Sequence, residues 1–390
     1  MELKKNILEY LKSDPYEISV DEKREKFLDL IKLQTRYHLD NCLPYRNWYL
    51  DNNFISPEEM SNIAQVPFIP SSAFKFVDLS SSNNDFKTIK SSGTSSQMKS
   101  QIFLDNNTSK NQTVALSKIL SSNLDKKRKH FFIIDIEPDK NDFKDLEMTA
   151  RYAGMQGYLM AAKKRTYLLK KNVKGELEFD EGKLSELLTT SSEESVVVIG
   201  YTYMLWQYLV NGDLEKIDLS SSKLIHFGGW KKLSDQKVDK AELVEKLTKK
   251  TSIDRNNILD IYGFTEQLGT VYVSRGISGC RASSYSEILV RDTDTFELVE
   301  DGKEGFLQFL SILPLSYPGF SILNDDLGRI TNRGETELGH FITLLLNFAS
   351  MIAATNLDTP IPYDPILTLT FFPSLRSTEH CKGFEYLSPK

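Results

Sequence analysis

The nine residues Ile258–Glu266, ILDIYGFTE, run from a short apolar segment into a turn that ends in a carboxylate. Three similar β-rich segments precede them in the chain: Phe131–Asp135 (FFIID), Val196–Gly200 (VVVIG) and Lys223–Phe227 (KLIHF). Stretches long enough for helices separate the four, including Lys240–Lys250. Near-continuous apolar strands that alternate with helices predict a mainly parallel sheet buried on both faces, and therefore an α/β fold.

The segments on either side of these strands have different patterns. Residues 1–50 are predicted to be helical, because apolar residues recur roughly on one helical face among charged ones. Ser56-Pro57-Glu58-Glu59 is predicted to begin a further helix. Ser286–Phe309 is predicted to be antiparallel, because two apolar runs flank a Gly-containing turn. We place a large domain at residues 1–325 and a small C-terminal part at 326–390.

The C-terminal segment has an unusual composition. From Leu338 to Leu375 only Asp358 and Asp364 carry formal charge, whereas 26% of the whole chain is charged. One interpretation is an apolar tail that packs on the main body. The other is an altered C-terminus, such as one produced by a shifted reading frame. The residues leave both interpretations open.

Composition limits the class of protein. The formal net charge of the 390 residues is −6, which argues against non-specific nucleic-acid binding. Cys42, Cys280 and Cys381 are odd in number and far apart, so a disulfide framework is not indicated and a reducing, cytoplasmic compartment is expected. Met1–Lys12 lacks the apolar core of a signal peptide, and no apolar run reaches the length of a membrane span.

The segment Ser91–Lys99, SSGTSSQMK, has the residue types of a phosphate-binding loop. Gly93 lets backbone N–H groups approach a phosphate, the hydroxyls donate hydrogen bonds, and Lys99 supplies charge. The spacing is not that of a Walker A loop. A flexible Ser/Thr-rich turn is the alternative.

Two further candidate sites directly follow predicted strands, where ligands of parallel sheets gather. Glu266 follows the strand that ends at Tyr262, and a carboxylate there suits a Mg²⁺ ion that bridges phosphates. Gly228 and Gly229 follow the strand that ends at Phe227, and they would let a flat ligand approach the backbone. A capped turn in the first case and a turn with a packed Trp230 in the second are the alternatives.

A fourth candidate lies at Asn324–Arg329, NDDLGR. The Asp326 carboxylate can accept hydrogen bonds from both hydroxyls of a ribose, and Arg329 could reach a phosphate. A plain acidic turn is the alternative.

Taken in order, the four segments resemble the motifs of the adenylate-forming superfamily of acyl-CoA synthetases, and most closely its LuxE-type acyl-protein synthetases. The resemblance covers roughly residues 20–330. It implies an adenylate-forming-enzyme-like large domain with mainly parallel sheets and a helical N-terminus, plus a small C-terminal part. It also rests on shorter phrases that LuxE-type proteins share, here Cys42-Leu43-Pro44-Tyr45-Arg46, Pro67–Pro70, Phe74-Lys75, Tyr152–Gly157 and Gly228–Leu233.

The resemblance implies a role for each matched residue. ATP phosphates would be held by the loop and its lysine, the adenine would lie between the glycine pair and a tyrosine, and the ribose would bind a carboxylate. Thr265 would contact the α-phosphate, Glu266 would bind Mg²⁺, and Arg329 would assist. The nucleotide-binding residues implied in this way are Ser91, Ser92, Gly93, Thr94, Ser95, Lys99, Gly228, Gly229, Tyr262 and Asp326.

The resemblance further implies activation of a carboxylic acid, in this branch a fatty acid, followed by transfer of the acyl group to a cysteine near the C-terminus. The Arg-Gly-Cys-Ser phrase of the branch is absent, so Cys381 is the candidate acceptor, and Ser96 replaces the usual second Gly of the loop. An acyl-accepting reductase, a carrier protein or coenzyme A would then take the acyl group.

We therefore predict an ATP-dependent acyl-adenylate-forming ligase. One alternative is a ligase that uses coenzyme A or a carrier protein as its acceptor. The other is an inactive nucleotide-binding relative that serves as a scaffold. The acid is not specified by the sequence, because Tyr201, Tyr203, Met204 and Trp206 would suit either an acyl pocket or an ordinary core.

Overall fold

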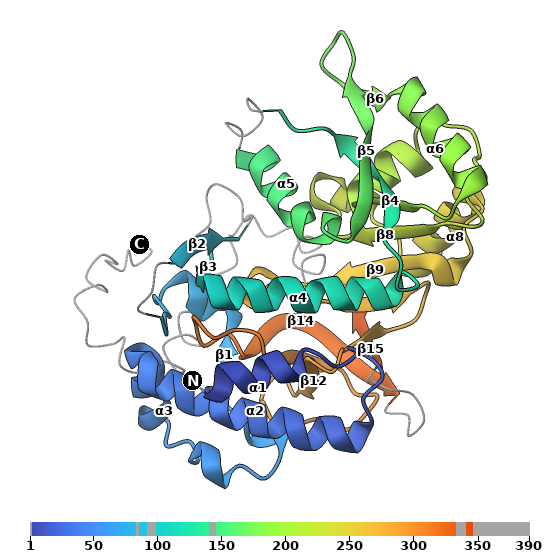
Figure 1. The fold of residues 1–390 in the computed structure, drawn as a ribbon. Helices are drawn as coiled ribbons and strands as arrows, with labels where there is room; N and C mark the ends of the chain where they lie inside the picture. Colours follow the sequence, from blue (N-terminus) through green and yellow to red (C-terminus); the bar gives the residue numbers. More distant parts are fainter. Residues whose placement is uncertain (1, 83–85, 92–98, 140–145, 333–340, 346–390) are drawn as a thin grey trace, which may run out of the picture.

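The computed structural model describes residues 2–82, 86–91, 99–139, 146–332 and 341–345 (Figure 1). All four predicted apolar segments form strands that pair in parallel. The parallel strands are β4 (Lys129–Ile136), β5 (Ala162–Lys171), β7 (Val197–Tyr201), β8 (Lys223–Phe227) and β9 (Ile258–Tyr262). Helices lie between them along the chain, so the predicted α/β class is confirmed.

The helices of this part are α4 (Asn106–Asn123), α5 (Leu146–Leu159), α6 (Glu181–Glu193), the single turn α7 (Thr202–Met204) and α8 (Lys240–Thr251). Local sequence sets their ends. In α8 the carboxylate of Asp239 accepts a hydrogen bond from the Glu242 N–H, while Lys249 and Lys250 lie in the last turn. Both features complement the helix dipole.

The second half of the sheet is antiparallel and extends further than the predicted region Ser286–Phe309. It includes β10 (Tyr272–Arg275), β11 (Cys280–Arg281), β12 (Ser286–Arg291), β13 (Gly305–Ser311), β14 (Ser321–Asn332) and β15 (Phe341–Leu345). With β6 (Leu177–Phe179) at the far end, the described strands run in the order β12–β13–β14–β15–β11–β10–β9–β8–β7–β4–β5–β6, and β1 (Ile69–Pro70) pairs with β14. The sheet is therefore mixed, with its parallel half made by the predicted strands.

The predicted boundary after residue 325 falls inside strand β14, which pairs with β13 on one side and β15 on the other. Residues 346–390, which hold most of the unusual C-terminal segment, lie outside the described residues. The division into two domains therefore stays a prediction.

Three helices open the chain, as predicted: α1 (Glu2–Tyr10), α2 (Val20–Asn41) and α3 (Leu43–Asp51). They pack beside the antiparallel half of the sheet, and α4 crosses between them and the parallel half (Figure 1). The helix predicted to begin at Ser56 is only one turn, Pro57–Glu59, because Met60 is already extended. The phosphate-loop candidate is flanked by a separate hairpin of β2 (Phe86–Lys90) and β3 (Gln101–Asp105).

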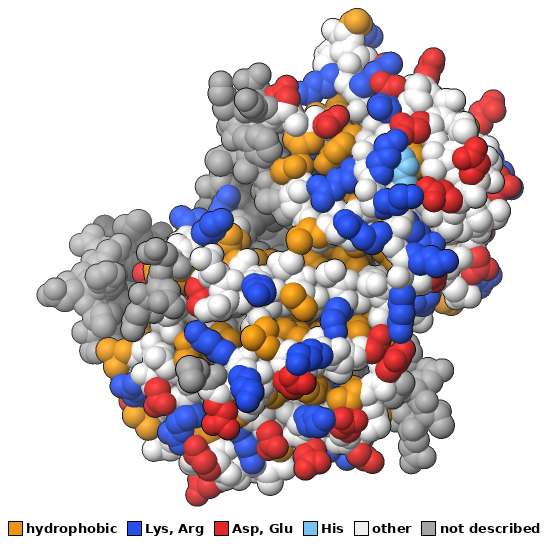
Figure 2. Space-filling view, in the orientation of Figure 1, with side chains coloured by type: hydrophobic (Ala, Val, Ile, Leu, Met, Phe, Trp, Pro, Cys, Tyr) orange, Lys and Arg blue, Asp and Glu red, His pale blue; other side chains and the backbone are white. Residues whose placement is uncertain are grey.

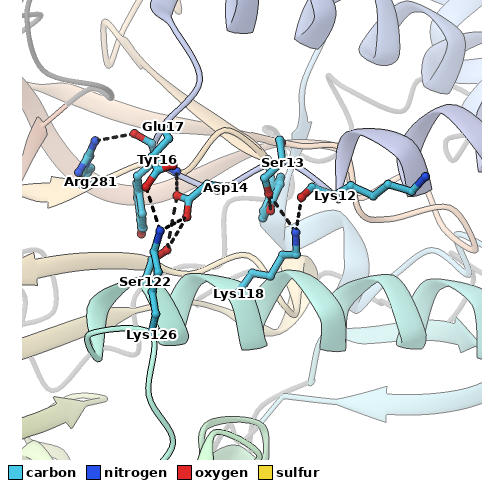
Figure 3. Close-up of polar contacts among 10 residues, drawn as sticks. Lys12, Ser13, Asp14, Tyr16, Glu17, Lys118, Ser122, Lys126 and Arg281 are labelled. Carbon is cyan, nitrogen blue, oxygen red and sulfur yellow. Dashed lines mark hydrogen bonds and ion pairs between the residues drawn. The ribbon is translucent and has the colours of Figure 1, made fainter.

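Polar contacts join the loop between α1 and α2 to α4 and to the residues just after it (Figure 3). Lys118 donates to the carbonyls of Lys12 and Ser13 at 2.7 and 3.1 Å. Lys126 pairs with Asp14 at 3.2 Å and with Glu17 at 2.9 Å. This contact set, which we call the α1–α2 latch, joins the N-terminal helices to the rest of the molecule.

Replacing Asp14 with Asn is expected to lower the free energy of unfolding by about 1 kcal/mol at neutral pH. Burial acts to raise the pKa of Asp14, but hydrogen bonds from the Tyr16 N–H, Lys126 and Ser122 outweigh it and leave that pKa lowered. The stabilisation is therefore present above the ordinary carboxyl value of about 4 and is lost as pH falls below it. Urea unfolding of both proteins at pH 7 tests this, and equal midpoints would contradict it.

Charges of both signs are interspersed over the molecular face of Figure 2. Lys and Arg side chains gather over β4, β5 and the end of α4, and several have acidic partners. Lys164 pairs with Glu186 at 2.6 Å, and Lys126 pairs with residues of the α1–α2 latch. Among the described helices, none combines the length and apolar character that a membrane crossing requires.

Candidate active site

The carboxyl ends of β8 and β9 bring two predicted site segments together. Phe227 pairs in register with Ile261, so Gly228 and Tyr262 follow as neighbours at the carboxyl ends of these two strands. Gly228 has a φ of +72°, and a Cβ there would lie 3.0 Å from the ring of Tyr201, whereas a Cβ on Gly229 would meet nothing within 4 Å. Gly229 therefore borders open space, as close approach of a flat ligand requires, while Gly228 lies against the ring of Tyr201.

Tyr262 and Asp326 are directly hydrogen-bonded, although 64 residues separate them in sequence. The Tyr262 hydroxyl donates to Asp326 Oδ2, and Asn324 Nδ2 donates to the Tyr262 hydroxyl at 3.0 Å and to Asp326 Oδ2 at 3.2 Å. Burial raises the pKa of Asp326, with the nearby Asp325 charge adding to it, while the Tyr262 hydrogen bond opposes it. The carboxylate is thus pre-oriented, with oxygen capacity left for a ligand hydroxyl.

An irregularity in β14 places these carboxylates. Leu327 pairs with Phe306 and Asn324 pairs with Leu307, so Asp325 and Asp326 have no register partner on β13. Extra residues in one strand bend it and re-aim its side chains, and bulges of this kind are frequent beside active sites. The alternation of a regular strand does not therefore set the direction of Asp326.

Glu266 lies in the single turn Thr265–Gln267 that follows β9, and only 7% of its surface is exposed. Burial raises the pKa of its carboxyl, with Asp325 adding to the rise, while a hydrogen bond with Ser100 and the charge of Lys75 act to lower it. A carboxylate that is costly to bury and linked to a serine and a lysine is typical of a functional position.

The contact with Ser100 joins Glu266 to the predicted phosphate loop. Ser91 N–H donates to the Ser100 carbonyl at 2.9 Å, and Ser100 N–H donates to Ser91 Oγ at 3.1 Å. These bonds close the β2–β3 hairpin at the base of the loop, and Lys99 lies half-buried beside them. Ser92, Gly93, Thr94 and Ser95, like Ser96, lie outside the described residues.

The structure thus gathers Ser91, Glu266, Tyr262, Asp326 and the glycine pair around the carboxyl edge of the parallel strands. Thr265 begins the Glu266 turn and is half-buried. Arg329 is exposed and lies beyond the bulge, where its backbone pairs with Thr343 of β15. Cys381 lies outside the described residues. The role of each residue stays a prediction.

Sequence reasoning gave no role to three residues that contact this site or act on it by charge. Ser100 contacts Glu266 but follows the quoted loop by one position, and the hairpin pairing that brings it there has no local signal. Asn324 lies in the NDDLGR segment, but the sequence analysis gave it no role, and in the structure it donates to Tyr262 and Asp326. Lys75 belongs to the Phe74-Lys75 phrase that LuxE-type proteins share, and that phrase could have marked it as a candidate site residue.

Of the four residues near Gly200 that suited either an acyl pocket or a core, Tyr201 reaches the site. Its ring lies 4.5 Å from that of Phe227 and contacts Gly228, and its hydroxyl donates to the Arg151 carbonyl at 2.7 Å. Met204 and Trp206 are buried, and the Trp206 indole N–H donates to Gln236 Oε1 at 3.2 Å. Those two side chains pack as core.

The part of the chain that the structure describes holds no group of three or more His, Cys, Asp or Glu side chains placed to ligate a metal. A cage made by the protein alone is thus not seen there. A single buried carboxylate is nevertheless the donor set by which Mg²⁺ is commonly held together with substrate phosphates. Glu266, beside the base of the loop, fits that mode.

Comparisons with known proteins identify relatives of this chain and of its fold. The chain is 23% identical over 327 residues to a long-chain-fatty-acid–luciferin-component ligase of Aliivibrio fischeri, with 80% of this chain and 82% of the relative covered. Its fold is similar to that of 2-hydroxyisobutyryl-CoA ligase in complex with 2-HIB-AMP, with a TM-score of 0.56, 12% identity, and coverage of 84% of this chain and 67% of the other. An open conformation of the same ligase gives a TM-score of 0.53 at 13% identity, with 85% and 75% covered.

These likenesses agree with the order of motifs and with the gathering of their residues at one edge of the sheet. The fold is that of adenylate-forming ligases, as the resemblance implied. The model of the acyl-protein synthetase family LuxE matches residues 3–345, which is most of the chain. The protein therefore belongs to the LuxE family of acyl-protein synthetases, ligases of the adenylate-forming class.

Proposed function

We propose that this protein activates a carboxylic acid with ATP and passes the acyl group to a thiol. A carboxylate oxygen of the acid attacks the α-phosphorus, the bond to the pyrophosphate leaving group breaks, and acyl-AMP and pyrophosphate result. The observation that carries the proposal is the meeting of the loop base, Glu266 and the Tyr262–Asp326 pair at one edge of the sheet. Three predicted nucleotide-contact segments, far apart in sequence, thereby face one location.

The chain's own residues would act mainly by positioning and by stabilising charge. Asp326, oriented by Tyr262, would accept the ribose hydroxyls, and Gly228 and Gly229 would border the adenine with Tyr262 stacked near it. Hydroxyls, backbone N–H groups and a lysine of the loop would hold the phosphate oxygens, and Thr265 and Arg329 would assist. The loop residues that we propose are Ser91, Ser92, Gly93, Thr94, Ser95 and Lys99. Glu266 would hold Mg²⁺, which when bound supplies positive charge to the phosphates.

A fatty acid is the substrate class we propose. The Aliivibrio fischeri relative is named for a long-chain fatty acid, and Tyr201 and Phe227 form an aromatic wall beside Gly228. An apolar chain would pack against such a wall while its carboxylate lies near the α-phosphate.

Pyrophosphate exchange into ATP, measured with a panel of fatty, aromatic and hydroxy acids, tests the proposal. We expect exchange that requires an acid and is greatest with fatty acids. Folded protein that binds ATP but exchanges no pyrophosphate with any acid would instead favour the inactive scaffold. Exchange with another class of acid would keep adenylation and overturn the fatty-acid substrate.

For the thiol step we propose Cys381 as the acyl acceptor, with a reductase, a carrier protein or coenzyme A receiving the group afterwards. Cys381→Ser is expected to abolish the covalent acyl-protein, because a serine hydroxyl is a far weaker nucleophile than a thiolate, while exchange stays unchanged. Gel autoradiography with labelled acid measures the covalent acyl-protein, and the pyrophosphate-exchange assay measures adenylation. Acyl transfer that depends on added coenzyme A but not on Cys381 would point to the alternative acceptor.

A further inference from the structure

Gln267 directly follows Glu266 and has no exposed surface. Its side-chain Nε2 donates two hydrogen bonds of 2.9 Å, one to the Phe309 carbonyl in β13 and one to the Gly319 carbonyl. Both donors of the amide are therefore used to join three backbone segments that are distant in sequence. The turn that bears Glu266 is tied to the sheet on one side and to residues 314–320 on the other.

Residues 314–320, which we call the brace, also touch Glu266 itself. A Cβ placed on Gly319 would lie 2.7 Å from the Glu266 carbonyl oxygen and 2.3 Å from the ring of Tyr317. Only a glycine leaves room for this approach, because real Cβ atoms do not come so near to backbone oxygen. The brace is thus in close contact with the backbone of Glu266.

The far side of the brace is held by α2. Gln34 Nε2 donates to the Pro314 carbonyl, and a ring nitrogen of His38 lies 3.3 Å from the same oxygen. The His38 ring also stacks on Phe320, with 5.3 Å between the ring centroids and 5° between the planes. The brace is therefore fixed between buried side chains of α2 and Gln267, and it gives the Glu266 turn a rigid support.

We propose that Gln267 is a positioning residue that sets the place of the Glu266 carboxylate, and so the ability of the site to bind ATP with Mg²⁺. This inference rests on the proposed function. Without the amide, two buried carbonyls lose their donor and the turn is released from both supports. Misplacement of a functional group by about 1 Å can reduce a rate about a hundredfold.

The test compares Gln267→Met with Gln308→Met. Gln308 is equally buried and lies beside Phe309 in β13, where its Nε2 donates to the Val66 carbonyl at 3.2 Å and to Ser321 Oγ at 2.9 Å. Both substitutions remove a buried amide that donates two hydrogen bonds, and both keep its volume. Gln308→Met also removes the acceptor of a 2.6 Å hydrogen bond from Arg291 Nε, so the control is at least as disruptive as the test variant. The Gln308 amide, however, bonds neither to the Glu266 turn nor to the brace.

The principal readout is the dissociation constant for ATP, measured by calorimetry with Mg²⁺ and with EDTA. The ratio of the dissociation constant with EDTA to that with Mg²⁺ gives the gain in ATP affinity from the metal. We expect Gln267→Met to reduce this ratio at least tenfold and Gln308→Met to leave it unchanged. In pyrophosphate exchange, Gln267→Met should lower kcat at least tenfold with the KM for the acid unchanged. Gly319→Ala, which displaces the Glu266 carbonyl from the other direction, should reproduce the pattern and serves if Gln267→Met does not fold.

The outcomes separate this inference from the function on which it rests. If the unaltered chain binds ATP more tightly with Mg²⁺ and folded Gln267→Met does so equally, the positioning role is wrong and the proposed function stands. An equal loss in both Met variants would show a merely structural role and overturn the inference as well. No ATP binding by the unaltered chain would overturn both proposals.

Discussion

Glu266→Gln is expected to lower pyrophosphate exchange at least about a hundredfold while raising the thermal stability of the protein. The loss of rate follows from the proposed role, because an amide neither carries the charge nor binds a cation as a carboxylate does. The gain in stability follows from burial. Glu266 is 7% exposed and its pKa is raised, so the ionised form is costly in the folded state at neutral pH.

The sign of the pH effect can be worked out. A raised pKa means that the folded chain binds the proton more tightly than the unfolded chain does. The free energy of unfolding therefore falls as pH rises from the ordinary carboxyl value to the raised pKa of Glu266, and the full penalty is present above that pKa. Gln removes that penalty, and the hydrogen bond with Ser100 can be kept because the amide also has an acceptor oxygen.

Scanning calorimetry at pH 7 and at pH 5 measures the stability effect, and exchange assays measure the rate. The increase in Tm of Glu266→Gln over the unaltered chain should be larger at pH 7 than at pH 5. Asp292→Asn is the control, because Asp292 is a half-buried carboxyl whose pKa is lowered, not raised, by backbone hydrogen bonds from Thr295 and Asp294. A lower Tm for Glu266→Gln, or unchanged exchange, would refute the prediction.

Asp326→Ala is expected to raise the KM for ATP about thirtyfold or more, because the ribose would lose two charge-assisted hydrogen bonds. Tyr262→Phe should have a smaller effect of a different kind. The Tyr262 hydroxyl donates to the ionised carboxylate and so holds the pKa of Asp326 down against burial. Its removal raises that pKa further, and the acid limb of kcat/KM for ATP should move to higher pH.

The two variants together distinguish a ribose ligand from a residue needed only for folding. Exchange assays from pH 5 to pH 8 provide both KM and the position of the acid limb. The comparison Tyr272→Phe controls for loss of a buried phenol, because Tyr272 is fully buried, pairs with Tyr262 across the strands and makes no hydrogen bond with Asp326. An acid limb that moves equally in both Phe variants would rule out the proposed link between Tyr262 and Asp326.

Much of the fold was predictable because its strands are short, apolar and separated by helical stretches. The ILDIYGFTE segment predicts a buried strand followed by a turn, and the structure has both, with Glu266 buried in the turn. Long-range placement was not predictable in the same way. The contact between Ser100 and Glu266 depends on how the β2–β3 hairpin lies against the sheet, which no local pattern expresses.

The direction of Asp326 was also outside the reach of pattern reasoning. Sequence alternation assumes a regular strand, and the two extra residues of β14 at Asp325 and Asp326 remove that assumption. Gln267 likewise had no signal, since a glutamine after a turn is usually exposed. Its importance follows from the carbonyls of Phe309 and Gly319, which come from separate parts of the chain.

Strand β14 has a consequence for where the polypeptide can be divided. It runs from Ser321 to Asn332 and pairs with β13 on one side. On its other side the first part pairs with β1 and the last part with β15. A fragment that stops at residue 325 would leave Gly305 and Phe306 of β13 without their partners, and unpaired strand edges promote aggregation. A hinge or an exchange of segments with a relative is thus better placed after β15, which keeps Asp326 on the same fragment as Tyr262.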